Sequence, residues 1–182
     1  VWALLGRCAV RIRDDTGWLL STARSATSWQ QGFNLWLNEV DSTELRDWLA
    51  HPAVLSSWSD EDKQALLLDL KRLSAQSKHA LKSWSDWQTA ARLDAPSPEQ
   101  SHVRHRTLAF LAQAIHHQKQ FAAAQTLSKW VDLTWAWATD FAMLDAWRVD
   151  AAGQVWLGLL ESWRAVNSSA PLRFAVFLRV LE

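Results

Sequence analysis

The sequence predicts an all-α protein, and three observations support this prediction. Ala and Leu each occur 27 times among the 182 residues, whereas Ile occurs only twice. Gly occurs 5 times and Pro 4 times, so helix-favouring residues are abundant and turn-forming residues are scarce. Apolar residues also recur at the three- and four-residue spacing of a helix. We therefore expect a bundle of about seven or eight helices.

Length and charge limit the organisation of the chain. A domain typically has about 100 to 200 residues, so residues 1–182 are expected to form one domain, with a subdivision into helical halves 1–95 and 96–182 as the alternative. The 19 basic residues balance the 19 acidic ones, so nucleic acid or an anionic membrane would need a local patch. A single Cys excludes an intramolecular disulfide, which fits a cytoplasmic protein best. No apolar run approaches the roughly 18 residues of a membrane span.

Three helices are expected in the first 60 residues. Residues 1–13 form an amphipathic pattern with an apolar face of Trp2, Leu5, Ala9 and Ile12, for which we favour packing within the chain over membrane binding. Residues 18–40 continue in helical register, with a bend expected at Gly32. Asp41-Ser42-Thr43-Glu44 has the form of a capping box and predicts a short helix that ends before Pro52.

A long helix is expected over residues 60–93. Ser59 is its predicted N-cap, and three carboxylates follow in the first turn, where the helix dipole favours negative charge. Spacings of four and three then continue for more than three heptads, through Leu66, Leu70, Leu73, Ser77, Ala80, Trp84, Trp87 and Ala91. We expect this 66–91 seam to pack against a helix of the same chain, with a homo-oligomer as the alternative.

Residues 94–98 are the clearest break in the chain, and Ser97 with Pro98 predicts a new helix that reaches His117. A polar turn over 117–120 should then lead into a helix that begins at Phe121. The apolar and small residues of this hairpin, Leu111, Ala112, Ile115, Phe121 and Ala124, resemble the packing residues of a tetratricopeptide unit. The resemblance covers about one repeat of 34 residues, and Asp145 stands where a second copy would repeat Leu111.

The central segment 120–166 contains six of the 14 Trp residues and no Pro. Its apolar residues lie on more than one helical face, so we expect one or two long helices that other helices cover, with a break at Gly153. Several Trp residues are seven positions apart and therefore share a face. We interpret them as core residues, with a ligand or partner groove as the alternative. Residues 172–181 are expected to form a closing helix.

Candidate chemical sites are few. Glu99 and His102 have the spacing of a metal-binding pair, but the other Glu residues are scattered, so neither a metal nor a cofactor is expected. Residues 102–106 form a local basic patch that could contact nucleic acid. We do not expect nucleic acid as the partner, because the protein as a whole is neutral. Asp140 and Asp145 lie among aromatic residues, and we expect structural roles for both, with Arg148 as the partner of Asp145.

The sequence therefore favours a non-catalytic scaffold or adaptor, a protein-interaction subunit of a bacterial-type cytoplasmic assembly. An apolar-ligand or pigment-binding bundle is the first alternative, and a nucleic-acid-associated subunit is the second. If the protein binds a partner, a groove along the helical hairpin from Pro98 to Trp130 is the predicted site. Its candidate residues are Arg104, His105, His116 and Trp130.

Overall fold

The structure is a computed structural model that describes residues 24–166 and 169–181. The described residues form nine α-helices and one 3-10 helix, and no strand, which confirms the all-α prediction. The predicted helix over residues 1–13, and the beginning of the one over 18–40, lie outside the described residues. The elements are α2 (Arg24–Leu37), α3 (Ser42–Ala50), α4 (Asp60–Gln76), α5 (Trp84–Leu93), η2 (Pro98–Gln100), α6 (Ser101–Phe121), α7 (Leu127–Asp140), α8 (Leu144–Val149), α9 (Ala151–Arg164) and α10 (Phe174–Leu181).

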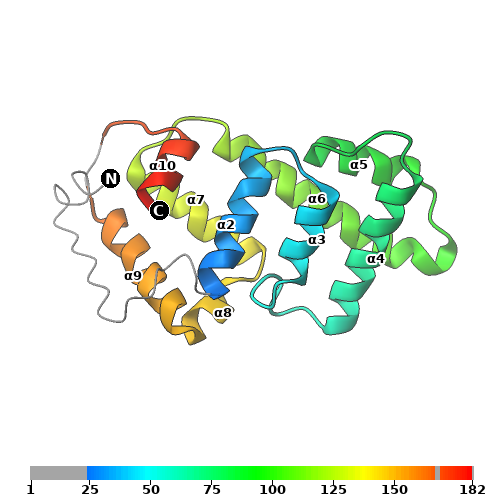
Figure 1. Cartoon of the computed structure of the whole chain (residues 1–182), viewed down its shortest axis with the longest axis horizontal. Helices are drawn as coiled ribbons and strands as arrows, with labels where there is room; N and C mark the ends of the chain where they lie inside the picture. The colour runs from blue at the N-terminus through cyan, green and yellow to red at the C-terminus, as the bar shows by residue number, and fades with distance from the viewer. Residues whose placement is uncertain (1–23, 167–168, 182) are drawn as a thin grey trace.

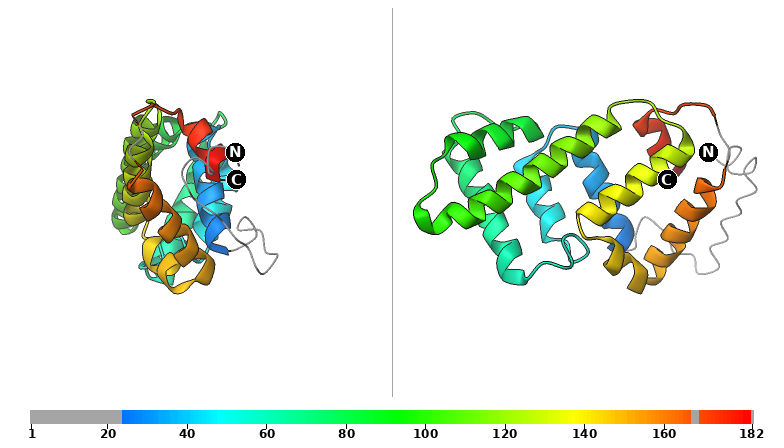
Figure 2. Two further views of the ribbon diagram at one scale, coloured as in Figure 1. Left: turned by 90° about the vertical axis from the view of Figure 1, so that its left-hand side faces the viewer. Right: turned by 180° about the vertical axis from the view of Figure 1, so that it is seen from behind.

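The helices form an elongated body in which α4 and α5 lie at one end and α9 and α10 at the other (Figure 1). Helices α6 and α7 run along one side, opposite α2 and α3 (Figure 2). Helix α6 packs against α4 and α5, and α9 packs against α2 and α7. Helices from both sides of residue 95 therefore share one cluster of buried side chains.

Local capping places the first helix ends where the sequence predicts them. The Asp41 carboxylate accepts hydrogen bonds from the backbone N–H groups of Thr43 and Glu44, at 2.7 and 3.2 Å, and α3 begins at the next residue. Ser59 accepts from the N–H of Asp62 at 3.1 Å and caps α4. Each cap satisfies a backbone donor that the first helical turn leaves without a partner.

The prediction of one helix over residues 60–93 is wrong, because the chain leaves the helix at Ser77 and re-enters it at Trp84. Ser77 donates from its hydroxyl to the carbonyl of His79 at 2.6 Å, a local bond that competes with the helix. Ser83 and Asp86 then form a complete capping box for α5. Six apolar positions of the 66–91 seam are buried against helices of this chain: Leu66, Leu70, Leu73, Trp84, Trp87 and Ala91. Ala80 is exposed, and the homo-oligomer alternative stays a prediction.

The predicted turn over residues 117–120 is also wrong. Helix α6 continues through Phe121, and α7 begins at Leu127 after Thr126, whose hydroxyl accepts from the N–H of Lys129. Ala112 and Ala124 are exposed, so they do not provide the small packing positions of a tetratricopeptide hairpin. The polar residues of this segment remain helical because His117 and Phe121 pack inward.

The Trp-rich segment 120–166 contains three helices after the end of α6, rather than one or two. The first break follows Asp140, where Ala142 has a φ of 50°, and the second is at Asp150, the N-cap of α9. Gly153 lies inside the first turn of α9, and its N–H donates to the Asp150 carboxylate at 3.0 Å. A Cβ at Gly153 would overlap the backbone of Trp147, so this Gly permits a close approach instead of a break.

The Trp residues form the core, as predicted. Ten of the twelve that the structure describes are buried, and Trp130, Trp137 and Trp147 have no exposed surface. Trp29 of α2 stacks on Trp156 of α9, with ring centroids 4.7 Å apart and an interplanar angle of 8°. This stack fixes the position of α2 against α9 and so fixes the side chains on the exposed face of α2.

Candidate functional site

The exposed face of α2 begins the candidate site. Phe33 and Trp36 point into the core, so Asn34, Leu37 and Asn38 face outward at the end of the helix. The Trp36 indole N–H donates to the carbonyl of Ala114 at 3.1 Å and ties this end of α2 to α6. The side-chain amides of Asn34 and Asn38 have no hydrogen-bond partner among the described residues.

The chain beyond α2 supplies the acidic part of the site. Glu39 lies in the linker to α3, and its carboxylate pairs with the ammonium of Lys82 at 3.0 Å. Both side chains are more than half exposed, at 69% and 61%. Asp41 and Glu44 follow at the N-terminus of α3. Hydrogen bonds from the N–H groups of Thr43 and Glu44 lower the pKa of Asp41, so this carboxylate stays charged.

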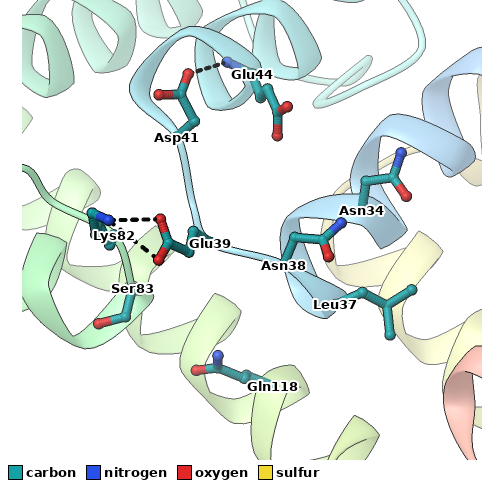
Figure 3. Close-up of a pocket in the computed structure, with 9 residues that line it drawn as sticks. All are labelled: Asn34, Leu37, Asn38, Glu39, Asp41, Glu44, Lys82, Ser83 and Gln118. Carbon is teal, nitrogen blue, oxygen red and sulfur yellow. Dashed lines mark hydrogen bonds and ion pairs between the residues drawn. The ribbon is translucent and has the colours of Figure 1, made fainter.

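These segments surround an open hollow with a volume of about 700 Å³ (Figure 3). Gln118 of α6 and Ser83, the N-cap of α5, close its remaining sides. The hollow is thus built from three helices, α2, α3 and α6, and from the linkers that precede α3 and α5. It is lined by Asn34, Leu37, Asn38, Glu39, Asp41, Glu44, Lys82, Ser83 and Gln118.

The charges of the hollow are predominantly negative. Three carboxylates, those of Glu39, Asp41 and Glu44, face one ammonium, that of Lys82, which leaves about two negative charges. The N-termini of α3 and α5 also lie here, but Asp41 accepts from the N–H groups of Thr43 and Glu44, and Ser83 accepts from that of Asp86. An anion would therefore meet carboxylates rather than open helix N–H groups.

Arg104, a predicted partner-binding residue, is instead 3% exposed and lies between α4, α5 and α6. Its Nε and Nη2 donate to both oxygens of Asp69, at 2.9 and 2.8 Å. Nη1 donates to the carbonyls of Ala91 and Asp94, and Nη2 also reaches the Asp94 carboxylate at 2.8 Å. This guanidinium is fully engaged inside the fold and offers nothing to a partner.

The partners of Arg104 are held just as firmly. Thr107 donates to Asp69 at 2.7 Å, and Arg72 joins Asp94 at 2.7 Å. Burial opposes ionisation of Asp69, but the hydrogen bonds from Arg104 and Thr107 outweigh it and keep the pKa of Asp69 below its usual value. The predicted basic patch over residues 102–106 loses a second cation too, because Arg106 pairs with Asp62.

The other predicted residues divide into buried and exposed ones. Trp130 has no exposed surface, and its indole N–H donates to the carbonyl of Leu172 at 2.8 Å. His105 and His116 are exposed. At 100° per residue, however, His116 projects about 160° away from Gln118 around α6, so neither His belongs to the hollow. The structure does not bring the four predicted residues together, and partner binding at the two His residues stays a prediction.

Asp140 belongs to a pair that the sequence reasoning missed. His117 is 1% exposed, and its Nε2 donates to the Asp140 carboxylate at 2.8 Å when Nε2 carries the proton. Burial lowers the pKa of His117 more than Asp140 raises it. Nδ1 of His117 is buried without a hydrogen-bond partner among the described residues. Asp145, in contrast, pairs with Arg148 at 2.9 Å, as predicted.

A second, smaller hollow of about 280 Å³ lies between α7 and α9, where Arg164 pairs with Asp132 at 3.0 Å. Trp135 is the Trp residue that lines it. Both hollows are open to solvent. The apolar-ligand alternative calls for an enclosed cavity surrounded by several Trp residues, and neither hollow has that form.

The comparisons add no assignment. No family model matches the chain, and no curated protein or solved structure matches it. No helix among the described residues has the length and apolar character that crossing a membrane requires.

Proposed function

We propose that this protein is a non-catalytic protein-interaction subunit of a larger cytoplasmic assembly, and that the hollow at the ends of α2 and α3 binds its partner. The observation that carries this proposal is the position of three amides, those of Asn34, Asn38 and Gln118. They face one hollow and have no hydrogen-bond partner among the described residues. An amide both donates and accepts, so the set matches the peptide groups of another protein.

The rest of the hollow supports a macromolecular partner. Leu37 is 40% exposed beside the amides at the edge of the hollow, and apolar and polar side chains occur together in protein interfaces. The volume of about 700 Å³ is within the usual range for binding sites, but the hollow is open on one side, which suits a segment of chain that passes through it.

Site-specific photocrosslinking tests this proposal. A benzophenone amino acid at Leu37 should give a discrete protein adduct in living cells that express the protein. The same group at Leu68, which is 64% exposed on α4, is the control for random encounters. Introducing Gln118→Arg should abolish the Leu37 adduct by placing a longer, positively charged side chain beside the carboxylates of the hollow. Equal crosslinking at both positions, or an adduct that survives Gln118→Arg, would remove the hollow as a partner site.

A further inference from the structure

We infer that the occupant of the hollow is an extended peptide segment that presents Arg or Lys to the carboxylates of Glu39 and Glu44, while its backbone bonds to Asn34 and Asn38. This inference rests on the proposed function and adds the chemistry of the partner. Three features of the hollow lead to it: the spacing of the amides, the excess of negative charge, and the capped helix ends.

The amide spacing matches an extended chain. Asn38 directly follows α2, and its backbone N–H still donates to the carbonyl of Asn34 at 2.9 Å. The two residues are therefore one helical turn, about 6 Å, apart at 1.5 Å per residue. Alternate residues of an extended strand repeat every 6.5 to 7 Å or so, and their peptide groups point the same way. Asn34 and Asn38 can therefore bond to two peptide groups of the segment that are two residues apart. Gln118, on the facing helix, lies across the hollow from them (Figure 3).

The charge of the hollow selects a cation. Glu44 has no ion-pair partner among the described residues, and the Glu39–Lys82 pair is exposed on both sides. An exposed pair of this kind is weak, so an incoming guanidinium can displace Lys82 and bond to Glu39 with both nitrogens. Asp41 adds a negative charge that is fixed in place by its bonds to the α3 backbone.

A phosphorylated or acidic segment fits this hollow poorly. Phosphate groups bind at helix N-termini whose N–H groups are open. The N-termini of α3 and α5 are both closed by their own caps, and Asp86 accepts from the N–H groups of Lys82 and Ser83 at 3.2 and 3.0 Å. A carboxylate or hydroxyl oxygen therefore already lies at each of these helix ends, where an anion would have to displace it.

Fluorescence anisotropy with two pools of labelled octapeptides tests the inference on the full chain. In one pool Arg is present at two positions that are two residues apart, and in the other pool Glu replaces both. All remaining positions are mixed in the same way. At an ionic strength of about 0.15 M, where free charges are screened beyond about 8 Å, the Arg pool should bind at least about tenfold more tightly.

Matched variants locate the binding. The double variant Asn34→Ala with Asn38→Ala should weaken the Arg pool about tenfold, because it removes the amide bonds, whereas Gln64→Ala removes an exposed helical amide elsewhere. Glu44→Gln should weaken binding several-fold, and Glu61→Gln is its control in the first turn of α4. Asn34, Asn38 and Glu44 are all exposed, so circular dichroism should show that every variant is folded.

The outcomes separate this inference from the proposed function. Preference for the Glu pool, or Arg-pool binding that the Asn variants leave unchanged, overturns the inference while a Leu37 adduct still supports a partner site. If neither pool binds although the Leu37 adduct forms, the extended cationic segment is wrong and the partner uses a folded surface. If neither pool binds and no adduct forms, both proposals fail.

Discussion

Charged side chains cross the interior where α4, α5 and α6 meet, whereas aromatic rings fill it where α2, α7 and α9 meet. The first region, here the charged end, contains Asp69, Arg72, Asp94, Arg104 and Thr107. The second, the aromatic end, contains Trp29, Phe33, Trp137, Trp156 and their neighbours. The charged end depends on the direction of each bond, and the aromatic end depends on the area and shape of the rings.

This difference explains what each region tolerates. In the charged end, removing one member of a buried ion pair leaves the other charge without compensation. This end is therefore sensitive to the loss of a single group. The aromatic end has many interlocking contacts, and it is sensitive to added volume instead. Single substitutions in each region should therefore differ in both size and sign of effect.

Arg104→Ala should produce the largest loss, about 3–5 kcal/mol of unfolding free energy, because the buried Asp69 carboxylate loses both bonds to the guanidinium and keeps only Thr107 and the partly exposed Arg72. Arg148→Ala breaks an exposed pair and should cost less than about 1 kcal/mol. Urea denaturation followed by circular dichroism measures both. If the two losses are equal, the charged end does not depend on its buried pair.

A double variant tests whether the loss comes from the uncompensated charge. Asp69→Leu combined with Arg104→Met replaces the buried pair by apolar side chains of similar length, so it should recover a large part of the loss seen in Arg104→Ala. Recovery will be incomplete, because the carbonyls of Ala91 and Asp94 lose their donor. A double variant as unstable as Arg104→Ala would contradict the account of an uncompensated charge.

Gly32→Ala tests the aromatic end and should cost about 1–3 kcal/mol. A Cβ at Gly32 would lie 2.5 Å from Cζ2 of Trp137 and 2.8 Å from Nε1 of Trp48, two rings with no exposed surface into which they can move. Gly158→Ala is the matched control, because a Cβ there meets nothing within 4 Å, and it should stabilise α9 by up to about 1 kcal/mol. Thermal unfolding should shift in opposite directions for the two variants.

Acid should affect the two regions in different pH ranges. Burial holds the pKa of His117 below its ordinary value of about 6.5, so the unfolded chain binds the proton first. The contribution of neutral His117 to the free energy of unfolding is complete above about pH 6.5. It is lost as the pH falls toward the pKa of His117 in the folded protein, by at most about 1.4 kcal/mol per pH unit. Asp69, whose pKa is also lowered, loses its contribution only below the ordinary Asp value of about 3.9.

Two groups with opposite effects surround His117. The Asp140 carboxylate favours the imidazolium, and the neighbouring His116 and the apolar surroundings oppose it. His117→Gln should therefore flatten the stability profile between about pH 6.5 and pH 5, and His105→Gln, at an exposed position, should leave it unchanged. A wild-type profile that is level across this range would show that Asp140 fully compensates for burial.

The fold was largely predictable because its signals are local or periodic. The caps at Asp41 and Ser59 depend on bonds within three residues, and the burial of Trp130 and Trp137 follows from helical spacing. The break at Ser77 was missed because a heptad pattern continues through it. Ala80 is exposed although the pattern places it on the seam, since the chain has already left the helix.

The candidate site was not predictable, because no short segment contains it. Asn34, Lys82 and Gln118 carry no motif, and only the packing of α2 on α6 brings them to one hollow. Arg104 failed as a surface prediction for a related reason. Its neighbours His102, His105 and Arg106 indicate a basic face, while the partner that draws it inward, Asp69, is 35 residues away.

By itself, the sequence determined that this chain is helical, where α3 and α4 begin, and that Trp fills its interior, because propensity, capping and periodicity act over a few residues. Only the tertiary structure decided which charges are buried and which amides line one hollow. Those outcomes depend on groups that are distant along the chain, and on whether each polar atom meets a complement once the helices have packed.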